Sequence, residues 1–165
     1  MMSPLIRSIL PQEFAQVREL SLEARKELPN FFGTTYNEEM ERSAAVVQAQ
    51  LAKGHVYGAW QNRELIACAG YFSGQLSKLR HKANLYGLYT HPHMRQRGMM
   101  IALLQRMIHE MPTEITVLGA SVVSDNLAAQ NILKKLGFSA YATEEYAMRD
   151  ELGAYHDLVL MRMNR

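Results

Sequence analysis

Apolar positions in the first part of the chain predict a short strand followed by a helix. Residues 5–10 form a brief apolar run, and the next apolar positions recur at helical spacing. These positions are Phe14, Val17, Leu20, Ala24 and Leu28. Pro11 suits the first turn of a helix because an N–H there has no helical partner, and Pro29 ends the run. We therefore expect a helix between the two prolines.

A second helical segment is expected to run from Thr35 to Gly54. Thr35 precedes Glu38 by three residues, a spacing typical of a capping box at a helix start. The apolar positions that share one face of this helix are Met40, Ala44, Val47 and Leu51. Glycine is the residue type that most often follows a helix end, so Gly54 is expected to close this one.

The middle of the chain changes to a β pattern. Residues 55–60 and 65–72 are rich in residues that favour strands, and a polar connection of hairpin length separates them. After a basic, polar stretch, residues 83–90 form a third run of this kind. We expect these three strands to form an antiparallel meander.

Gly98 marks the start of a third helix. The apolar face of this helix comprises Met100, Leu103, Leu104, Met107, Ile108 and Met111. Pro112 lies just beyond these positions, where a helix is expected to stop. Residues 115–123 then predict a buried strand.

The last part of the chain predicts one more helix and two strands. The helix covers residues 127–136, with Ser124 or Asp125 as its N-cap and Gly137 after its end. The two strands are expected over residues 138–141 and 157–163. The element order β-α-α-β-β-β-α-β-α-β-β, without a linker or repeat, predicts one domain of the α/β (α+β) class over residues 1–165.

Composition and charge narrow the class of protein. Of the 165 residues, 48% are hydrophobic and 21% charged, proportions typical of a globular domain. Eighteen Lys and Arg against sixteen Asp and Glu leave a net charge of +2, which argues against nucleic acid as a main partner. No apolar run approaches the ~20 residues that span a bilayer, and the N-terminal residues lack a signal-peptide core. The lone Cys68, mid-strand in an apolar run, predicts a buried, inert thiol and a cytoplasmic protein.

The segment from Tyr89 to Met100 carries the strongest chemical signal. It places a polar, basic loop containing Gly98 between a strand and a helix. Backbone N–H groups at a helix start, together with the helix dipole, form a site where a phosphate can dock. Gly98 lets the backbone approach the anion, and Arg95 and Arg97 add mobile positive charge for a pyrophosphate or a 3′-phosphate. A solvated turn with two arginines is the alternative interpretation of this loop alone.

Two motifs on consecutive strand–helix units carry a family resemblance. Arg95, Gly98 and Met100, after Pro92, match a pyrophosphate loop with the pattern Gln or Arg, two residues, Gly, one residue, Gly or Ala. A second pattern, Asn, two residues and Ala before a short helix that ends in Gly-Phe, is matched by Asn126, Ala129, Gly137 and Phe138. Together the motifs resemble the GNAT superfamily of acetyl-CoA-dependent N-acetyltransferases, and the element order over the whole chain is similar to that fold.

The resemblance implies a mixed, mostly antiparallel sheet of six to seven strands flanked by about four helices, with a splayed pair of strands at the acetyl-CoA site. The tail, residues 143–148 and 155–157, is similar to the endings of a broad bacterial subgroup. The implied reaction is direct attack of a neutral amine on the thioester of acetyl-CoA, with a strand N–H stabilising the oxyanion and with no metal.

The resemblance also implies which residues bind the coenzyme. The backbone of residues 88–90 would pair with the pantetheine arm, and the N–H groups of residues 96–100 would hold the pyrophosphate. Asn126 would reach the pantetheine or line the acetyl end. The implied coenzyme-binding set comprises Leu88, Tyr89, Thr90, Arg95, Gln96, Arg97, Gly98, Met99, Met100, Asn126 and Ala129.

Two positions depart from the family pattern. Met100 replaces the second small residue of the loop, but it fits the apolar face of its helix and keeps its N–H, so we expect coenzyme binding to be kept. Leu133 stands where many relatives have a tyrosine that protonates the departing thiolate, and leucine donates no proton. We therefore expect no indispensable general acid, and we expect Leu133→Tyr to raise turnover.

The general base is not evident from the sequence. The strand at residues 83–90 has no carboxylate, although family members often place one there. Tyr86 and His81 are nearby titratable candidates, and a packed tyrosine and a surface histidine are the simpler interpretations. His156 and Asp157 open the last strand, and we interpret them as a polar pair at a strand end.

Histidines and aromatic residues elsewhere have ordinary structural interpretations. His91 and His93 have i, i+2 spacing, but no Cys or carboxylate cluster accompanies them, so we expect solvated loop histidines and no metal site. Phe31, Phe32 and Tyr36 either line the acceptor pocket or pack the first two helices together.

The leading hypothesis is an N-acetyltransferase that uses acetyl-CoA and acts on a primary amine of a small molecule or peptide. The alternative is an acetyl-CoA- or CoA-binding protein with little transferase activity, and a plain nucleotide-phosphate binder ranks third. We expect neither a nucleic acid nor a membrane as a partner, and a homodimer is left open.

Overall fold

The computed structural model describes residues 3–165, which form seven strands and five α-helices. The strands are β1 (Leu5–Ser8), β2 (Val56–Gln61), β3 (Glu64–Ser73), β4 (Lys82–Thr90), β5 (Val117–Val123), β6 (Ser139–Arg149) and β7 (Tyr155–Asn164). The α-helices are α1 (Phe14–Glu27), α2 (Tyr36–Glu41), α3 (Ala44–Ala52), α4 (Met99–Glu110) and α5 (Leu127–Lys135). Four 3₁₀ helices lie between them: η1 (Pro11–Glu13), η2 (Pro29–Phe31), η3 (Ser77–Leu79) and η4 (Pro92–Met94).

The strands form one mixed sheet in the order β1-β2-β3-β4-β5-β7-β6. β4 and β5 pair in parallel, whereas β1–β2, β2–β3, β5–β7 and β6–β7 pair antiparallel. The mostly antiparallel α/β fold expected from the sequence is thus confirmed. None of the helices in residues 3–165 has the length and apolar character needed to cross a membrane.

The chain divides into two compact units. Unit 1 comprises the residues up to Gly70 together with Gly87–Met111, and unit 2 comprises Tyr71–Tyr86 and Pro112–Arg165. Strands β3 and β4 therefore each contribute residues to both units.

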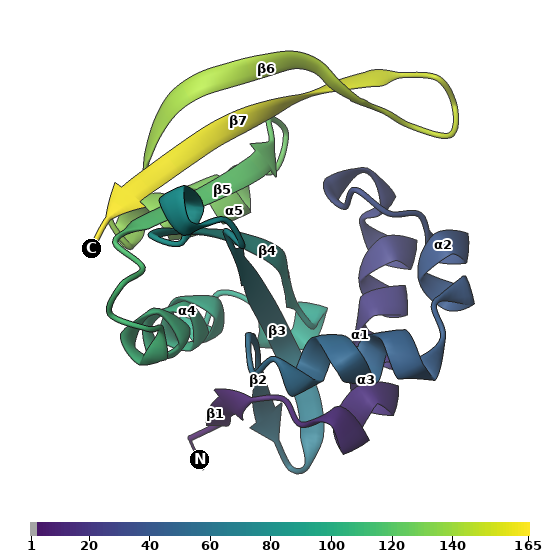
Figure 1. Cartoon of the computed structure of the whole chain (residues 1–165). Coiled ribbons are helices and arrows are strands. Elements are labelled where there is room, and N and C mark those ends of the chain that lie inside the picture. The colour runs from purple at the N-terminus through teal and green to yellow at the C-terminus, as the bar shows by residue number, and fades with distance from the viewer. Residues whose placement is uncertain (1–2) are drawn as a thin grey trace. The chain divides into compact units, whose positions relative to one another are not determined.

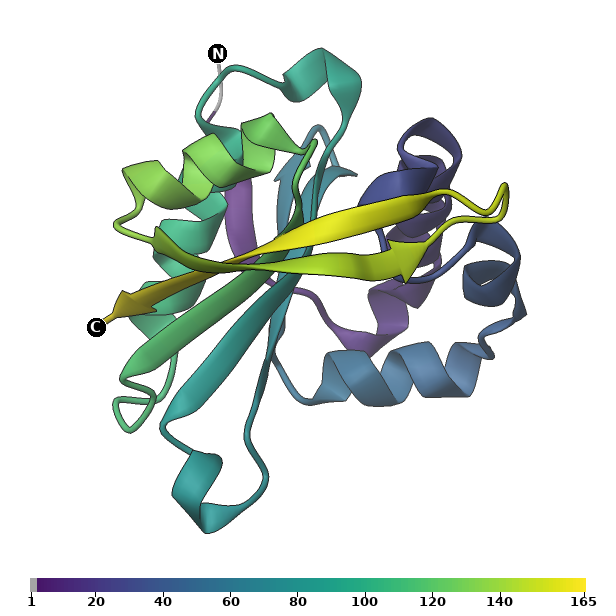
Figure 2. The same ribbon diagram turned by 90° about the horizontal axis from the view of Figure 1, so that it is seen from above.

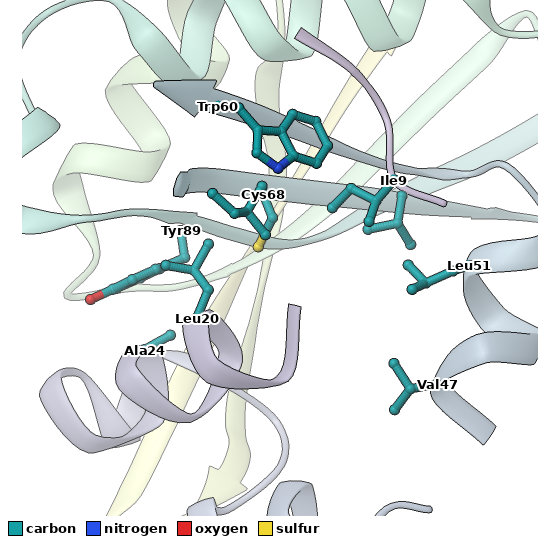
Figure 3. Close-up of a cluster of buried hydrophobic side chains, with 10 residues drawn as sticks. Ile9, Leu20, Ala24, Val47, Leu51, Trp60, Cys68 and Tyr89 are labelled. Atoms are coloured by element: carbon teal, nitrogen blue, oxygen red, sulfur yellow. The ribbon is translucent and has the colours of Figure 1, made fainter. Parts of the chain in front are cut away.

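Helices cover both faces of the strands in unit 1. Figure 1 shows α1 and α3 on one side of β1, β2 and β3 and α4 on the other, and α4 contacts β1 and β2. The buried cluster drawn in Figure 3 joins Leu20 of α1 and Leu51 of α3 to Trp60 and Cys68 of the strands. Burying each large side chain of this kind stabilises the fold by about 1.5–3 kcal/mol. The helical spacing of the apolar residues in α1 is therefore explained by this core.

The region expected to form one helix from Thr35 to residue 54 contains two helices, so that prediction was wrong, and the count of α-helices is five. The capping box at Thr35 is confirmed, because Glu38 N–H donates to Thr35 Oγ1 and Thr35 N–H donates to Glu38. After α2 ends, Ser43 adopts an extended backbone and its Oγ accepts the Val46 N–H at 3.2 Å. This new cap restarts the helix in another direction, so Met40 is 50% exposed instead of sharing the buried face of α3.

In unit 2, β6 and β7 form a long hairpin whose strands run side by side (Figure 2). Both strands extend beyond the ranges predicted from the sequence. The register of β6 shifts between Ala140 and Ala142 and again between Glu144 and Met148. Residues 139–146 are all exposed, so β6 lacks the alternating buried face that would have revealed its length.

Candidate active site

The connection from β4 to α4 presents an open helix start in unit 1. Gly98 is the N-cap of α4 with a φ of 72°, the left-handed conformation that glycine adopts at little cost. Gln96, two residues earlier, also has a positive φ of 60°. A Cβ built on Gly98 would meet no atom within 4 Å, so the space beside its backbone is open. Because glycine has no side chain to cap the helix, the first-turn N–H groups are not satisfied by their own N-cap residue.

The charge distribution at the start of α4 favours an anion. The first turn contains no acidic residue, and the loop before it carries Arg95 and Arg97. The helix dipole adds partial positive charge at the same end. This arrangement is the one that binds phosphate groups at helix starts.

Arg95 does not contribute the mobile charge expected from the sequence. Its Nη1 lies 2.7 Å from Oε1 of Glu27, its Nη2 donates to Oε2 of Glu27 at 2.8 Å, and its Nε donates to the carbonyl of Thr90 at 3.0 Å. The hydroxyl of Tyr89 donates to the same carboxylate at 2.7 Å. The expectation of a mobile side chain was therefore wrong for Arg95, because α1 supplies a carboxylate that pairs with it. Arg97 is exposed, and its Nη1 lies 3.9 Å from the sulfur of Met94.

The pairing with Arg95 also decides what Glu27 can do. The hydrogen bond from Arg95 holds the pKa of the Glu27 carboxyl below its usual value, and the hydrogen bond from Tyr89 lowers this pKa further. A carboxylate with a lowered pKa is a weak proton acceptor near neutral pH. Glu27 therefore lacks the properties of a general base, although it lies beside the loop.

The strand proposed to pair with pantetheine has an irregular backbone before residues 88–90. Gly87 has a φ of 67°, so the extended course of β4 is interrupted immediately before Leu88. Tyr89 is buried, and its ring meets the ring of Phe32 edge to face at a centroid distance of 6.4 Å. The side chain of Tyr89 thus fixes this part of β4 to the core of unit 1.

Met99 and Met100 both bury their side chains. Their exposed fractions are 7% and 5%, and they share the buried face of α4 with Leu103, Leu104 and Met107. The expectation that Met100 belongs to the apolar face of its helix is confirmed. The replacement of the family's small residue therefore adds no side chain to the exposed surface of the loop.

In unit 2, the connection from β5 to α5 is capped by its own asparagine. Oδ1 of Asn126 accepts the N–H of Ala129 at 3.2 Å, so Asn126 is the N-cap. The expectation that Ser124 or Asp125 caps this helix was wrong. Leu133, one of the two departures from the family pattern, has an exposed fraction of 0%. A tyrosine is larger than the leucine that it would replace at this fully buried position, and adding bulk to a buried site usually destabilises it, which changes the expectation for Leu133→Tyr.

The two catalytic candidates, His81 and Tyr86, also lie in unit 2. His81 is exposed, and its backbone carbonyl accepts the N–H groups of Thr116 and Val117. Tyr86 is half-buried, with its ring 6.0 Å from that of Phe72. These surroundings fit the structural interpretations, and neither residue becomes a stronger candidate.

His156 and Asp157 lie at the start of β7, in agreement with their interpretation as polar residues at a strand end, and they do not bond to one another. Nε2 of His156 lies 2.8 Å from Oδ2 of Asp150, while Oδ1 of Asp157 accepts the N–H of Tyr146 at 2.9 Å. The hydrogen bond from His156 lowers the pKa of the Asp150 carboxyl. The two adjacent residues instead hold two different points of the β6–β7 hairpin.

The loop histidines form contacts within unit 1. Nε2 of His91 lies 3.3 Å from Glu23, and Nδ1 of His91 accepts the N–H of His93. Within residues 3–165, no group of three or more His, Cys, Asp or Glu side chains is arranged to hold a metal ion.

The aromatic segment and the cysteine of unit 1 have structural roles. Phe32 packs against the buried cluster, and the guanidinium of Arg25 lies 5.0 Å from its ring, which favours the interpretation that Phe32 holds the helices together. Tyr36 is more exposed, at 36%. Cys68 is buried, as predicted, and burial raises the pKa of its thiol to about 12.

Two hollows in unit 1 are lined by residues other than 95–100. A hollow of about 810 Å³ is bordered by residues of β1, η1 and the β2–β3 turn, including Arg7, Glu13 and Trp60. A second hollow of about 300 Å³ includes His91 and Glu23. Neither is lined by residues 95–100, so the candidate coenzyme site is defined by the helix start and not by these hollows.

The sequence profile of the acetyltransferase (GNAT) family matches residues 18–138, which include both strand–helix connections. The chain belongs to the GNAT family. It is an acetyltransferase by this membership, as the two sequence motifs predicted. A comparison with curated protein sequences finds no match.

Solved structures of GNAT acetyltransferases share the fold of the whole chain. One from Streptococcus pneumoniae has 20% identity and a TM-score of 0.85, covering 98% of this chain and 99% of that one. Ribosomal-protein-alanine N-acetyltransferase from Brucella melitensis has 18% identity and a TM-score of 0.80, with 98% and 99% covered. Phosphinothricin acetyltransferase from Sinorhizobium meliloti, in complex with acetyl-CoA, has 17% identity and a TM-score of 0.80, with 99% and 89% covered. At these identities the likeness shows a common fold.

Proposed function

We propose that this GNAT acetyltransferase moves the acetyl group of acetyl-CoA to the primary amine of a small molecule or a peptide, with residues 1–165 acting as one catalytic domain. The observation that carries the proposal is the open start of α4, where Gly98 leaves the first-turn N–H groups without a side-chain cap. A pyrophosphate matches this site in charge and in hydrogen-bonding capacity. The similar fold of an acetyltransferase in complex with acetyl-CoA supports the same coenzyme.

The coenzyme would bind along the β4–α4 connection. The N–H groups of residues 96–100 would hold the pyrophosphate, and the backbone of residues 88–90 would pair with the pantetheine arm, as the splayed strands of the family imply. By the family resemblance, Asn126 and Ala129 would also belong to the coenzyme-binding residues. Arg95 and Arg97 are both exposed, but Arg95 is already paired with Glu27, so Arg97 is the better candidate for contact with a phosphate.

The reaction would proceed by direct transfer. The amine nitrogen attacks the thioester carbonyl carbon, and a C–N bond forms as the carbonyl oxygen becomes an oxyanion that a strand N–H stabilises. The C–S bond then breaks, CoA leaves as a thiolate, and the amine proton passes to water. The pKa of a free thiol is about 8.5, so the thiolate leaves near neutral pH without a strong proton donor. Leu133 supplies no such donor, which fits a mechanism without a dedicated general acid.

The acceptor is an amine whose identity the fold does not select. Acceptors of two kinds are represented among proteins of similar fold, which include a phosphinothricin acetyltransferase and ribosomal-protein-alanine N-acetyltransferases. A cytoplasmic setting, expected from the single cysteine, would provide acceptors of both kinds.

A protein that binds acetyl-CoA with little transferase activity is the second candidate. Two observations favour it: Leu133 replaces the family's proton donor, and Glu27, the carboxylate beside the loop, is paired with Arg95. A sensor of this kind would keep the binding loop and dispense with proton transfer.

Two measurements test the proposal. Thermal shift with acetyl-CoA, CoA and ATP tests coenzyme binding, and we expect stabilisation by the first two but not by ATP. Release of free thiol from acetyl-CoA over a library of amines tests transfer, and we expect the rate to rise with pH towards the pKa of the acceptor amine. Binding without thiol release for any amine would favour the sensor. A bell-shaped pH profile would show that a general acid or base was missed.

A further inference from the structure

The most completely bonded side chain of the candidate coenzyme loop is Arg95, and its partner lies far away in the sequence. Its guanidinium meets both carboxylate oxygens of Glu27, 68 residues earlier, at 2.7 and 2.8 Å. The remaining nitrogen, Nε, donates to the carbonyl of Thr90 at 3.0 Å, which ties the loop to the end of β4. Two parallel bonds between a guanidinium and a carboxylate fix both distance and orientation.

Tyr89 extends this network into the core of unit 1. Its hydroxyl donates to Glu27 Oε2 at 2.7 Å, and the guanidinium of Arg95 lies 5.4 Å from the centre of its ring. The ring belongs to the buried cluster that also holds Leu20 and Ala24 of α1 (Figure 3). Glu27 therefore receives hydrogen bonds from both β4 and the loop, while its own helix is packed against the same cluster.

The position of Glu27 on its helix is unusual for an acidic residue. Glu27 is the last residue of α1, where the helix dipole favours basic side chains such as the neighbouring Arg25 and Lys26. A carboxylate at this point is stabilised by its partners instead of by its helix. Its placement is thus explained by the loop that it holds.

The loop has reason to need such an anchor. Residues 95–98 are all exposed, and both Gln96 and Gly98 adopt left-handed backbone conformations. A positive φ is uncommon and strained for a residue such as Gln96, so surrounding contacts must maintain it. A loop held in its binding conformation before the ligand arrives avoids the entropic cost of ordering at the moment of binding.

We propose that Glu27 is a positioning residue, which through Arg95 and Tyr89 holds the coenzyme loop in the conformation that binds the pyrophosphate of acetyl-CoA. This inference rests on the proposed coenzyme site. It assigns to Arg95 a role in holding the loop instead of direct contact with a phosphate, and it connects the end of α1 to coenzyme affinity.

The decisive experiment measures the dissociation constant of CoA by calorimetry for the wild-type chain, Glu27→Gln, Arg95→Lys and the control Glu19→Gln. Glu19 is an exposed carboxylate on the same helix. We expect Glu27→Gln and Arg95→Lys each to weaken CoA binding about tenfold, because each loses the two-bond ion pair, while Glu19→Gln leaves it unchanged. If Arg95 contacted a phosphate directly, Glu27→Gln would free it and tighten binding, and Arg95→Lys would keep most of the affinity. That pair of results would overturn the inference.

Limited trypsin digestion without CoA tests the anchor independently of any ligand. Trypsin cleaves after arginine, and Arg95 and Arg97 both lie in the loop. We expect cleavage after Arg97 to be several-fold faster in Glu27→Gln than in the wild type or Glu19→Gln, because the loop is released. Unchanged cleavage in a folded Glu27→Gln variant would overturn the anchor. Arg95→Lys is the second variant if Glu27→Gln does not fold.

The two proposals fail in different ways. A wild-type chain that does not bind CoA overturns the proposed coenzyme site, and with it the role assigned here to Glu27. If the wild-type chain binds CoA and Glu27→Gln binds it with the same affinity, only the positioning role of Glu27 is overturned.

Discussion

The two strand-to-helix connections, from β4 to α4 in unit 1 and from β5 to α5 in unit 2, differ in how the unpaired N–H groups of the helix start are treated. At α5, Asn126 places its side-chain oxygen on the Ala129 N–H and satisfies the helix start with its own cap. At α4, Gly98 provides no side chain, and the loop before it is held from outside by Glu27.

The difference separates a helix start that serves the fold from one that is available to a ligand. A side-chain cap uses one of the four N–H groups that a helix leaves unpaired at its start. A glycine in the left-handed conformation leaves these groups to other partners, and an anion is the partner that the dipole favours. The two helices also each carry a residue that departs from the family pattern, Met100 in α4 and Leu133 in α5, and both of these side chains are buried.

Replacing Gly98 with valine should have the largest effect, which is the loss of coenzyme binding at the start of α4. Valine disfavours the left-handed backbone by about 1–2 kcal/mol, and its side chain would enter the open space beside the loop. At a ligand concentration of 100 times the wild-type dissociation constant, acetyl-CoA should stabilise the wild-type chain by about 2.7 kcal/mol and Gly98→Val by almost nothing. Thermal shift measures the difference.

Gly54→Val is the matched control for this experiment. Gly54 also has a left-handed backbone, with a φ of 74°, and also has no atom within 4 Å of a built Cβ. The control should lose stability without ligand but keep the full shift with acetyl-CoA. An equal shift in Gly98→Val would mean that the phosphates bind elsewhere.

Leu133→Tyr should destabilise unit 2 instead of raising turnover. The larger ring would overpack a fully buried site, which we expect to lower the unfolding free energy by about 1–3 kcal/mol. Urea unfolding measures the loss, and Leu133→Met, which conserves volume, should stay close to the wild type. A stable Leu133→Tyr variant with faster thiol release would show that the core accommodates the family's tyrosine after all.

Asn126→Ala should cost about 1 kcal/mol of unfolding free energy, because the N–H of Ala129 loses its cap. Asn126→Ser keeps a capping oxygen and should retain most of the stability in the same urea experiment. Weaker CoA binding by a stable Asn126→Ser variant would mean that the amide also contacts the coenzyme. If CoA affinity falls only to the extent that stability falls in the two variants, Asn126 acts only as a helix cap.

His81→Ala and Tyr86→Phe should have the smallest effects. His81 contributes its backbone carbonyl to the fold, which alanine keeps, and phenylalanine keeps the ring of Tyr86. Each variant should lose less than the ~10²-fold in kcat that removal of a general acid or base usually costs. Initial rates of thiol release measure this loss, and a collapse in either variant would identify the missing catalytic residue.

Local patterns in the sequence predicted most of the fold. Helical spacing identified α1 and α4, because a helix that packs on a core buries every third or fourth residue, whichever element it packs against. The break between α2 and α3 was missed, although Ser43 before a run of helix-favouring residues was a usable signal of a second cap. The length of β6 was missed for another reason: an exposed strand with shifts of register has no hydrophobic alternation to detect.

The sequence by itself determined where the loop before α4 lies and that Gly98 leaves the helix start without a side-chain cap, because these signals belong to residues of the segment itself. It also determined the apolar face that carries Met100. Only the tertiary structure decided that Arg95 is paired and not mobile, because its partner Glu27 lies 68 residues away. Only the tertiary structure showed that Leu133 is fully buried, since burial depends on the elements packed around a residue. Helix starts and apolar periodicity depend on near neighbours in the chain, whereas the pairing of charges and the burial of a side chain depend on which distant segments the fold brings together.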